Sequence, residues 1–511
     1  MIKPGFASSK WEALHRDKSG VLQRAERAAK VTLPAVFPLE GHTENSHLPA
    51  PYQGLGARAV NTLSAKITLA LFPPNTTFFR IGFDEVTKSL LEGNDRLEEI
   101  QKNISLLEQI IVTELEQTRL RSILNEAVRH LIIAGNGAIE CDRDGNFRFH
   151  GLRSYCVQRD PQSHLLFFIL KETVAFETID EKIIEELKAT DPSFRGPTDP
   201  TDDVDIFTVM QRKDNKFEVW QEINNTQIES TKATYPLDAP PFIVVRWSNL
   251  PDENYGRGLV DDYYADFAAM DDLSRDMLDA SAISAKVILT VDPNGVLTSR
   301  KLRDSKAGDV LDGDADSVKA ITVDKMGDFN VVIQRIETIS EEIRKAFLMH
   351  SSVTRNAERV TAEEIRFMAS ELEDALGGVY SLLGHDLQAP LLRRYIKVLG
   401  RQKKIPDIPG DEMALKITTG IEALGRSHEV MKLVTFVQQA RELLGPELLA
   451  QRVNPGAVLH ALAAGLGVAA DNLVMSDEEV AAQQQQMAMQ QMAQQAAPGM
   501  AQEAMRQQGA Q

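Results

Sequence analysis

The sequence predicts an α+β fold in which long amphipathic helices adjoin a body of mixed helices and strands. From residue 361 to about residue 399, apolar residues recur at three- and four-residue steps, the spacing of one helix face. Between about residues 137 and 247 the period changes to two, and turn pairs such as Asp144-Gly145 separate the alternating runs. A second long helical pattern covers residues 258–284. Helices and strands in separate runs are typical of the α+β class.

Length and charge limit the function classes. A chain of 511 residues divides into several domains, and a formal net charge of −18 argues against a protein that grips nucleic acid over its whole surface. Cys141 and Cys156 are the only cysteines, too few for a disulfide framework or a zinc site, so we expect ordinary buried thiols and an intracellular, reducing assembly environment. We expect no signal peptide after Lys3-Pro4-Gly5 and no transmembrane segment.

The N-terminal half combines helices and strands. Helical periodicity covers residues 10–29, 54–72 and 94–135. Strand patterns cover a hairpin at 137–150 and runs at 165–171, 205–212, 217–221 and 242–247. Gly54, Gly56 and Ala59 match the glycine pattern of dinucleotide-binding folds. That site requires a preceding strand, and Pro49-Ala50-Pro51 stands there instead, so we expect no dinucleotide cofactor.

The strand-bearing aromatic residues Phe147, Phe149 and Trp220 have two interpretations. They could form a stacking platform for nucleic acid. Few basic residues interleave with them, so the core of a small sheet is the favoured interpretation.

A turn-rich unit lies between two helical segments in the middle of the chain. The helix predicted at 258–284 carries many aspartates, which we interpret as a solvated acidic face. Strand patterns follow at 287–291, 321–323 and 329–333, and a further helix at 336–349. A basic cluster comprises Arg300, Lys301, Arg303 and Lys306. The acidic run after it is not a calcium loop of the EF-hand type, because position 12 counted from Asp309 is Ala320 and not Glu.

The helix from Thr361 begins with a capping box, since Glu364 follows Thr361 by three residues. Gly377-Gly378 and Pro390 lie within its pattern, so we expect a bent rod. A Pro-marked linker at 402–416 and an Ala-rich helical region at 421–473 follow. The Gln-, Ala- and Met-rich residues 481–511 are expected to be flexible.

No known catalytic motif occurs, neither Walker A nor GxSxG nor HExxH, and no cofactor is expected. Two hypotheses stand beside each other: a structural, ring-forming protein that guides DNA, and a multidomain enzyme with an unrecognised site. Two long, partly polar helices that flank a β unit favour the first, because such helices need neighbouring copies to cover them.

Several runs resemble one protein family, in the same order along the chain. They are GARAVNTLSAKITLALFP at 56–73, AGNGAIE at 134–140, YCVQRD at 155–160, YGRGLVDDYYADF at 255–267, SAKVILTVDPNGV at 284–296, ERVTAEEIRFMASELEDALGGVYS at 358–381 and TTGIEALGR at 418–426. Together they resemble the portal proteins, or head-to-tail connectors, of short-tailed bacteriophages, from near residue 10 to about residue 480. The chain departs from that family most in the 198–203 loop and in the Gln-rich tail.

The resemblance implies a portal-type fold with defined parts. These are an α/β wing at 1–257, a first stem helix at 258–284, a β-containing clip at 285–335, a second stem helix at 336–350, a tunnel loop or valve at 351–360, a long kinked wing helix at 361–405, a helical crown at 406–480 and a flexible tail at 481–511. In the tunnel loop, Arg355, Asn356 and Arg359 would approach DNA. The alternative is that Arg355 and Arg359 pair with Glu358, Glu363 or a neighbouring subunit. In the clip, Arg300, Lys301, Arg303 and Lys306 would dock partners.

The resemblance also implies a location and partners. Such proteins form a ring, usually of twelve subunits, at one capsid vertex of the virion, and are assembled in the host cytoplasm. Double-stranded DNA passes through the channel during packaging and ejection. The expected protein partners are the terminase large subunit, the tail adaptor, and the major capsid, scaffolding and internal core proteins. No enzymatic activity and no membrane association are expected.

Overall fold

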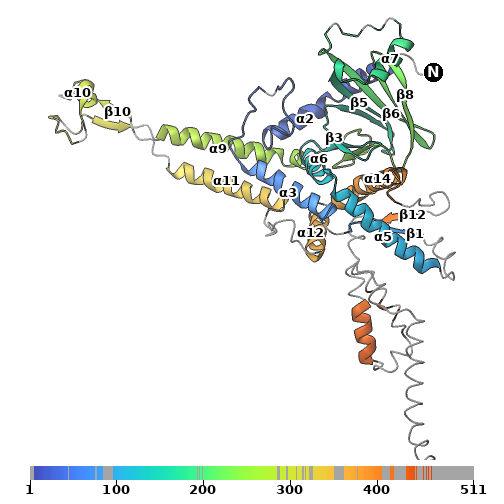
Figure 1. Ribbon diagram of the computed structural model, residues 1–511. Coiled ribbons are helices and arrows are strands. Elements are labelled where there is room, and N and C mark those ends of the chain that lie inside the picture. Colours follow the sequence, from blue (N-terminus) through green and yellow to red (C-terminus); the bar gives the residue numbers. More distant parts are fainter. Residues whose placement is uncertain are drawn as a thin grey trace, which may run out of the picture. The chain divides into compact units, whose positions relative to one another are not determined.

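A computed structural model of the chain contains two compact units (Figure 1). The first comprises Met1–Thr76, Ile110–Val360 and Phe367–Glu412, and the second Thr77–Gln109, Thr361–Arg366 and Met413–Gln511. The structure describes residues 5–43, 45–74, 77–83, 96–192, 199–284, 288–294, 297–306, 308–313, 318–321, 326–349, 362–376, 378–405, 415–418 and 433–443, and residues 194, 196, 197, 316, 445, 453, 456, 458, 459 and 462.

Two short helices open the first unit where the sequence predicted one. α1 (Phe6–Asp17) and α2 (Ser19–Lys30) are separated at Lys18. The break turns the Lys18 side chain inward, where Nζ donates to the carbonyls of Leu152 (3.0 Å) and Tyr155 (2.7 Å). α3 (Leu55–Leu71) agrees with the prediction. The pattern at 94–135 also comprises two helices, α5 (Arg96–Glu116) and α6 (Leu120–Ala134), and α6 packs against α3.

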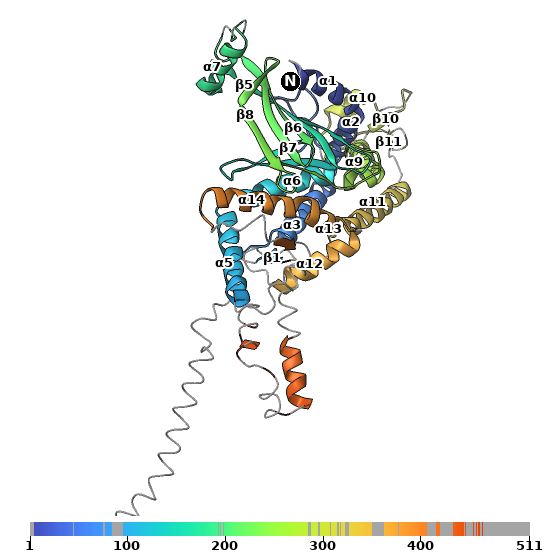
Figure 2. The same cartoon turned by 90° about the vertical axis from the view of Figure 1, so that its right-hand side faces the viewer.

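The first unit holds two antiparallel sheets of three or more strands (Figure 2). The larger has the order β4-β5-β6-β7-β8, with β4 (Tyr155–Arg159), β5 (Leu165–Ala175), β6 (Asp203–Lys213), β7 (Lys216–Ile223) and β8 (Thr226–Pro236). The smaller has the order β3-β2-β9, with β2 (Asn136–Cys141), β3 (Phe147–His150) and β9 (Phe242–Arg246). η1 (Phe176–Thr178) and α7 (Glu181–Thr190) follow β5. The predicted hairpin and strand runs are confirmed, whereas periodicity did not predict β4, β8 and α7.

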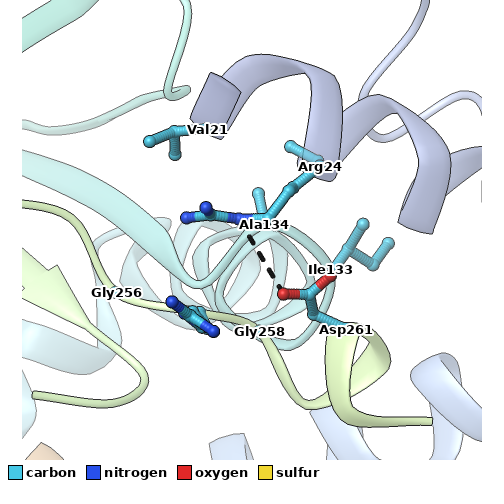
Figure 3. Close-up of a pocket in the computed structure, with 9 residues that line it drawn as sticks. Val21, Arg24, Ile133, Ala134, Gly256, Gly258 and Asp261 are labelled. Atoms are coloured by element: carbon cyan, nitrogen blue, oxygen red, sulfur yellow. Dashed lines mark ion pairs between the residues drawn. The ribbon is translucent and has the colours of Figure 1, made fainter. Parts of the chain in front are cut away.

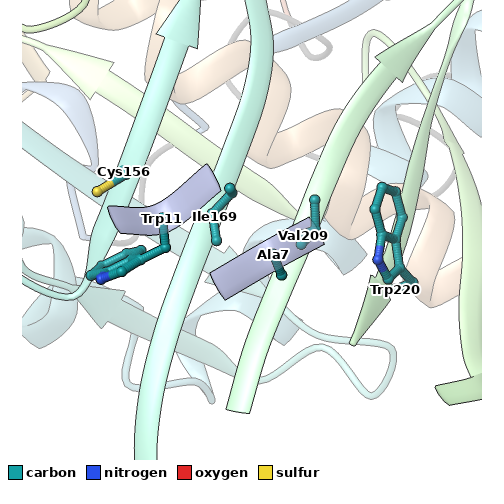
Figure 4. Packing of buried hydrophobic residues seen from close by; sticks show 6 residues of the cluster. All are labelled: Ala7, Trp11, Cys156, Ile169, Val209 and Trp220. Atoms are coloured by element: carbon teal, nitrogen blue, oxygen red, sulfur yellow. The ribbon is translucent and has the colours of Figure 1, made fainter. Parts of the chain in front are cut away.

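α1 packs on the larger sheet (Figure 4). Its Ala7 and Trp11 contact a cluster formed by Cys156, Ile169, Val209 and Trp220. Trp220 is fully buried and Phe147 is 9% exposed, so the interpretation as sheet core is confirmed for these two rings, whereas Phe149 is half-buried. Both cysteines are free and buried, as expected, and burial raises the pKa of the Cys141 thiol to about 12.

A helical hairpin extends the first unit. α8 (Leu259–Asp262) and α9 (Tyr264–Ser284) lead to β10 (Ile288–Val291), α10 (Ser299–Asp304) and β11 (Val318–Ile321), and α11 (Met326–Ala346) returns. Phe267 contacts Phe347, with ring centroids 5.5 Å apart, and Ser340 Oγ lies 3.5 Å from Met270 Sδ. These pairings show that α9 and α11 run antiparallel. We call these two helices the helical hairpin, and β10, α10 and β11 the tip module.

Two predictions in this region were wrong. Residues 329–333 are helix, not strand, and α11 begins at Met326, ten residues before the predicted start at Ile336. Phe329, Val332, Ile336 and Ile339 repeat at helical steps, but the short apolar run at 331–333 has the appearance of a strand. The basic segment at 299–304 is a helix that was not predicted.

The long helix is interrupted at both expected positions. It comprises α12 (Ala362–Ala375), α13 (Val379–Leu383), the π-helical turn η4 (Gly384–Gln388) and α14 (Ala389–Arg401). Gly378 separates α12 from α13 with φ +89°. Pro390 lacks an N–H and its ring would clash with the carbonyl of Asp386, which accounts for the wider turn before it. The predicted cap at Thr361 lies outside the described residues.

The second unit contains a two-stranded antiparallel sheet. β1 (Arg80–Phe83) pairs with β12 (Leu415–Thr418), so part of the predicted linker is a strand. Within this unit the Ile81 N–H donates to the buried carboxylate of Glu108 at 2.7 Å. Residues 433–443 are helical. Most of the predicted crown and all of the tail at 481–511 lie outside the described residues.

Candidate functional site

The helical hairpin is well packed only near the sheets. There Phe267, Met270, Ile339, Ile343 and Phe347 are buried between α9 and α11. Further along, large apolar side chains are exposed: Leu278 is 56% exposed, Val331 67% and Ile333 40%. Exposed apolar side chains on neighbouring elements mark a surface that another chain can cover.

Negative charge covers much of the remaining surface of α9. Asp272, Asp276 and Asp279 are all exposed, and Arg275 is the basic residue of this helix. In α8, burial and the neighbouring Asp261 carboxylate raise the pKa of Asp262. In the part of the chain that the structure describes, no group of three or more His, Cys, Asp or Glu side chains is arranged to hold a metal. The exposed aspartates of α9 form a negatively charged surface.

The tip module brings together the four basic residues singled out from the sequence. Arg300, Lys301 and Arg303 lie on α10, Lys306 follows it in the chain, and all four are exposed. The Lys306 N–H donates to the Asp309 carboxylate at 2.7 Å, which fixes the turn after the helix. Asp309, Asp312 and Asp316 are exposed in the same module, so both signs of charge occur there.

Little apolar packing supports the tip module. β10 and β11 pair antiparallel from Ile288↔Ile321 to Val291↔Val318. Among the described side chains of 288–321, Leu297 is the buried apolar residue, and a Cβ added at Gly313 would lie 2.2 Å from Leu297 Cδ1. Val310 is 95% exposed. So small a core contributes little to the stability of the module.

The predicted DNA-contacting residues Arg355, Asn356 and Arg359 lie outside the described residues. The structure describes the chain before them up to residue 349 and after them from residue 362. α11 ends at Ala346. Two residues later, the carbonyl of the left-handed Leu348 (φ +53°) accepts a hydrogen bond from Lys66 Nζ at 2.6 Å. Sequence reasoning missed Lys66. Its signal was a lysine that directly precedes Ile67, a residue of the apolar face of this helix.

A small hollow lies between α2, α6 and α8 (Figure 3). Arg24 Nε lies 3.9 Å from Asp261 Oδ2, and the two charges partly neutralise each other. The backbone approaches closely here, since a Cβ at Gly258 would lie 2.6 Å from the Ile132 carbonyl oxygen. This hollow holds an ion pair, and its lining has no nucleophile paired with a base.

Comparison with known proteins identifies the family. The family model described as "Bacteriophage head to tail connecting protein" matches residues 6–474. The chain belongs to this family. The portal protein of Enterobacteria phage T3 is 32% identical over 479 residues, which cover 93% of this chain and 89% of the relative. The portal protein of Escherichia phage T7 is 32% identical (95% and 90% covered) and that of Pseudomonas phage phiKMV 30% identical (94% and 94%).

Solved structures give more distant matches. The neck of a native GTA particle is 12% identical with a TM-score of 0.34, covering 80% of this chain and 89% of that chain. The neck of an empty GTA particle is 13% identical with a TM-score of 0.37, covering 82% and 93%.

The family confirms the resemblance stated from the sequence. The chain is a portal protein of the head-to-tail connecting family. Because its relatives are named as portal proteins, it is a structural component of the phage particle and not an enzyme. Within the described residues, no helix is long and apolar enough to span a membrane.

Proposed function

We propose that twelve copies of this connecting protein close into a ring at one capsid vertex, and that double-stranded DNA passes through its channel during packaging and ejection. The observation that carries the proposal is the helical hairpin. Its outer part leaves Leu278, Val331 and Ile333 exposed in the single chain. Covering these side chains with neighbouring copies would remove apolar area from water, which is the main favourable term in association.

Charge supports a channel through which DNA slides. Each neutralised phosphate adds affinity, so a wall that binds phosphates strongly would hold the duplex in place. Twelve copies would carry twelve times the −18 of one chain, a formal charge of −216. Such a field repels a duplex from the wall. The exposed aspartates of α9 are consistent with a place in that wall.

A few cations suffice to centre or stop DNA in such a channel. We assign this role to Arg355, Asn356 and Arg359 of the 351–360 tunnel loop, which connects the hairpin to the long kinked helix. Arginine suits the role because its guanidinium binds phosphate in a bidentate manner.

The tip module is proposed as the docking site at one end of the ring. Its exposed Arg300, Lys301, Arg303 and Lys306 would contact the terminase large subunit during packaging and the tail adaptor afterwards. The sheet-bearing wing, the crown and the rest of the outer surface would contact the major capsid, scaffolding and internal core proteins. Assembly is proposed to take place in the host cytoplasm.

The experiment for this function is substitution of the loop arginine in assembled particles. Arg359→Ala is expected to leave ring assembly intact and to reduce the DNA packaged or retained per particle, because a phosphate contact is lost. The matched control is Arg401→Ala, an exposed arginine on α14. Equal DNA retention by Arg359→Ala and wild-type particles would contradict the assignment of the loop.

A further inference from the structure

The segment that leads into the helical hairpin is fastened to the sheet-bearing body at one crossing of the chain. Residues 254–258, which precede α8, lie against residues 132–136, where α6 ends and β2 begins. α8 leads directly to α9, the first helix of the hairpin. We call these two crossing segments the hairpin joint.

Glycines allow the two backbones of the joint to approach closely. A Cβ at Gly258 would lie 2.6 Å from the Ile132 carbonyl oxygen, and one at Gly256 would lie 2.8 Å from that of Gly135. Gly135 itself has φ +72°, and a Cβ there would lie 2.4 Å from the Arg257 carbonyl carbon. The atoms approached are all backbone atoms, which cannot rotate away as a flexible side chain can. The joint therefore leaves little room for α8 to shift relative to α6.

One buried side chain, Asn136, ties the two segments together. It is 2% exposed, and its Oδ1 accepts from the Gly256 N–H at 2.8 Å. Its Nδ2 donates to the carbonyls of Gly256 (2.9 Å) and Ala134 (2.8 Å). At the same crossing the Trp247 N–H donates to the Gly135 carbonyl at 2.9 Å. Loss of the Asn136 amide would leave buried backbone groups unpaired.

A closed ring requires a defined direction of the hairpin relative to the body. Neighbours in a ring of twelve are related by a rotation of about 30°, and in a ring of thirteen by about 28°. Subunit contacts made by the body and those made by α9 and α11 must close with the same rotation. The two rings differ by only about 2° per subunit, so a small change in the direction of the hairpin favours another subunit number.

We infer that the hairpin joint sets the number of subunits in the ring, and that Asn136 is a positioning residue within it. This inference rests on the proposed ring. Asn136 acts by holding the segment before α8 against the end of α6, and it need not contact a neighbouring copy or DNA. The joint thereby fixes the direction in which α9 leaves the body.

The test widens the joint and counts the subunits. In Gly258→Ala the added methyl group meets the end of α6, while the backbone at φ −80° is one that alanine adopts. Full-length rings are purified, and native mass spectrometry gives the subunit number. We expect the mean number to shift by about one or more, or a mixture of ring sizes, with the far-UV circular dichroism of the folded chain retained. The matched control is Gly20→Ala on α2, where no atom lies within 4 Å of the added Cβ.

A second variant removes the hydrogen bonds without adding a methyl group. Asn136→Ala is expected to give a broader distribution of ring sizes than the wild type, because the two segments are no longer tied. Asn61→Ala, at an exposed position on α3, is its control and should give the wild-type distribution.

A purely stabilising role of the joint gives a different result. Gly258→Ala and Asn136→Ala would then lower the thermal midpoint and still form rings with the wild-type distribution of subunit numbers, which overturns the inference. The wild-type chain in the same experiment separates the two claims. If it forms no ring, the proposed function fails; if it forms rings that the variants leave unchanged, the inference alone fails.

Hydrogen exchange of the wild-type chain decides if neither variant folds. The Gly256 and Trp247 amides are then expected to exchange as slowly as those of β6, the middle strand of the larger sheet. Such protection supports a rigid joint. Exchange as fast as that of Asp252 in the exposed turn before the joint would overturn the inference.

Discussion

Buried carboxylates are costly unless donors surround them, and Glu222 illustrates how this chain meets that requirement. Glu222 is 2% exposed on β7. One carboxylate oxygen accepts from the Ala7 N–H at 2.9 Å and the other from Trp220 Nε1 at 3.0 Å. The first donor lies in the opening turn of α1, where a negative charge is also favoured by the helix dipole. Glu222 thus fastens α1 to the larger sheet.

We predict that Glu222→Gln weakens this attachment. Glutamine offers one acceptor and one NH₂ donor, so one of the two N–H donors would face another donor. The expected loss is about 1–3 kcal/mol in the free energy of unfolding. Urea denaturation followed by tryptophan fluorescence measures it, since Trp11 and Trp220 both lie in the α1 cluster.

The control for that measurement is Glu218→Gln on the same strand. Glu218 pairs with Lys213 at 3.1 Å on the surface, and such pairs contribute little. A destabilisation by Glu222→Gln no greater than that of Glu218→Gln would show that the buried contacts are not stabilising α1.

The second prediction at this scale is a pH dependence that arises from His130. Burial lowers the pKa of His130 from 6.5 to about 4. The centroids of the His130 and Phe149 rings lie 4.6 Å apart. The unfolded chain therefore binds a proton that the folded chain excludes, and stability falls as the pH drops from about 6.5 toward 4. The loss between pH 7 and pH 5 is about 2 kcal/mol from this residue.

His130→Phe is expected to remove that contribution, so its free energy of unfolding changes less between pH 7 and pH 5 than that of the wild type. The exposed His385→Gln is the control and should retain the wild-type dependence. Identical pH dependence in wild type and His130→Phe would exclude His130 as the source.

Among the secondary-structure elements, α9 and α11 of the helical hairpin are the ones that we expect to contact neighbouring subunits. Its apolar side chains are buried near the sheets, whereas Leu278 and Val331 are 56% and 67% exposed in the single chain. If neighbouring copies bury these side chains fully, each side chain contributes about 1.5–3 kcal/mol to the free energy of association. The helical hairpin would then fold in the monomer, and its exposed apolar side chains would become buried when the ring assembles.

We therefore predict that Leu278→Asp combined with Val331→Asp abolishes ring formation while the sheets of the body stay folded. Sedimentation velocity measures the ring, and the tryptophan fluorescence of the α1 cluster reports the body. Thr234→Asp, an exposed polar position on β8, is the control for added charge. Rings at wild-type yield from the double variant would rule out these side chains as subunit contacts.

Elements with a regular period were predictable from the sequence, and the exceptions have physical causes. The β2–β3 hairpin was predicted because Asp144-Gly145 supplies a turn, and Gly145 has φ +88°. β8 was missed because its polar, exposed residues such as Glu229 and Lys232 do not alternate with apolar ones. The strand predicted at 329–333 was wrong because a short apolar run does not by itself distinguish a strand from a helix, and Phe329, Val332 and Ile336 follow the helical period of α11.

The candidate site was predictable in composition but not in contacts. The basic cluster at 300–306 was apparent from charge alone, and the structure adds that three of its members share α10. Lys66 and Glu222 were not found, because their partners Leu348 and Ala7 are distant in the chain. Pairings of that kind depend on the folded arrangement and leave no periodic signal.

For the whole molecule, family membership, net charge and incomplete packing of the helical hairpin all agree with assembly into a larger particle. Membership of the head-to-tail connecting family establishes the class of protein. The net charge of −18 and the partly exposed hairpin support an assembly that encloses DNA without gripping it. One chain alone cannot form such a channel, so the proposed function requires a ring of subunits.

The most direct test of that claim is single-particle electron microscopy of the purified full-length chain in the absence of other viral proteins. We predict a closed ring of twelve subunits around a channel wide enough for duplex DNA, with α9 and α11 at the subunit contacts. A monomer or compact dimer without a channel would contradict it.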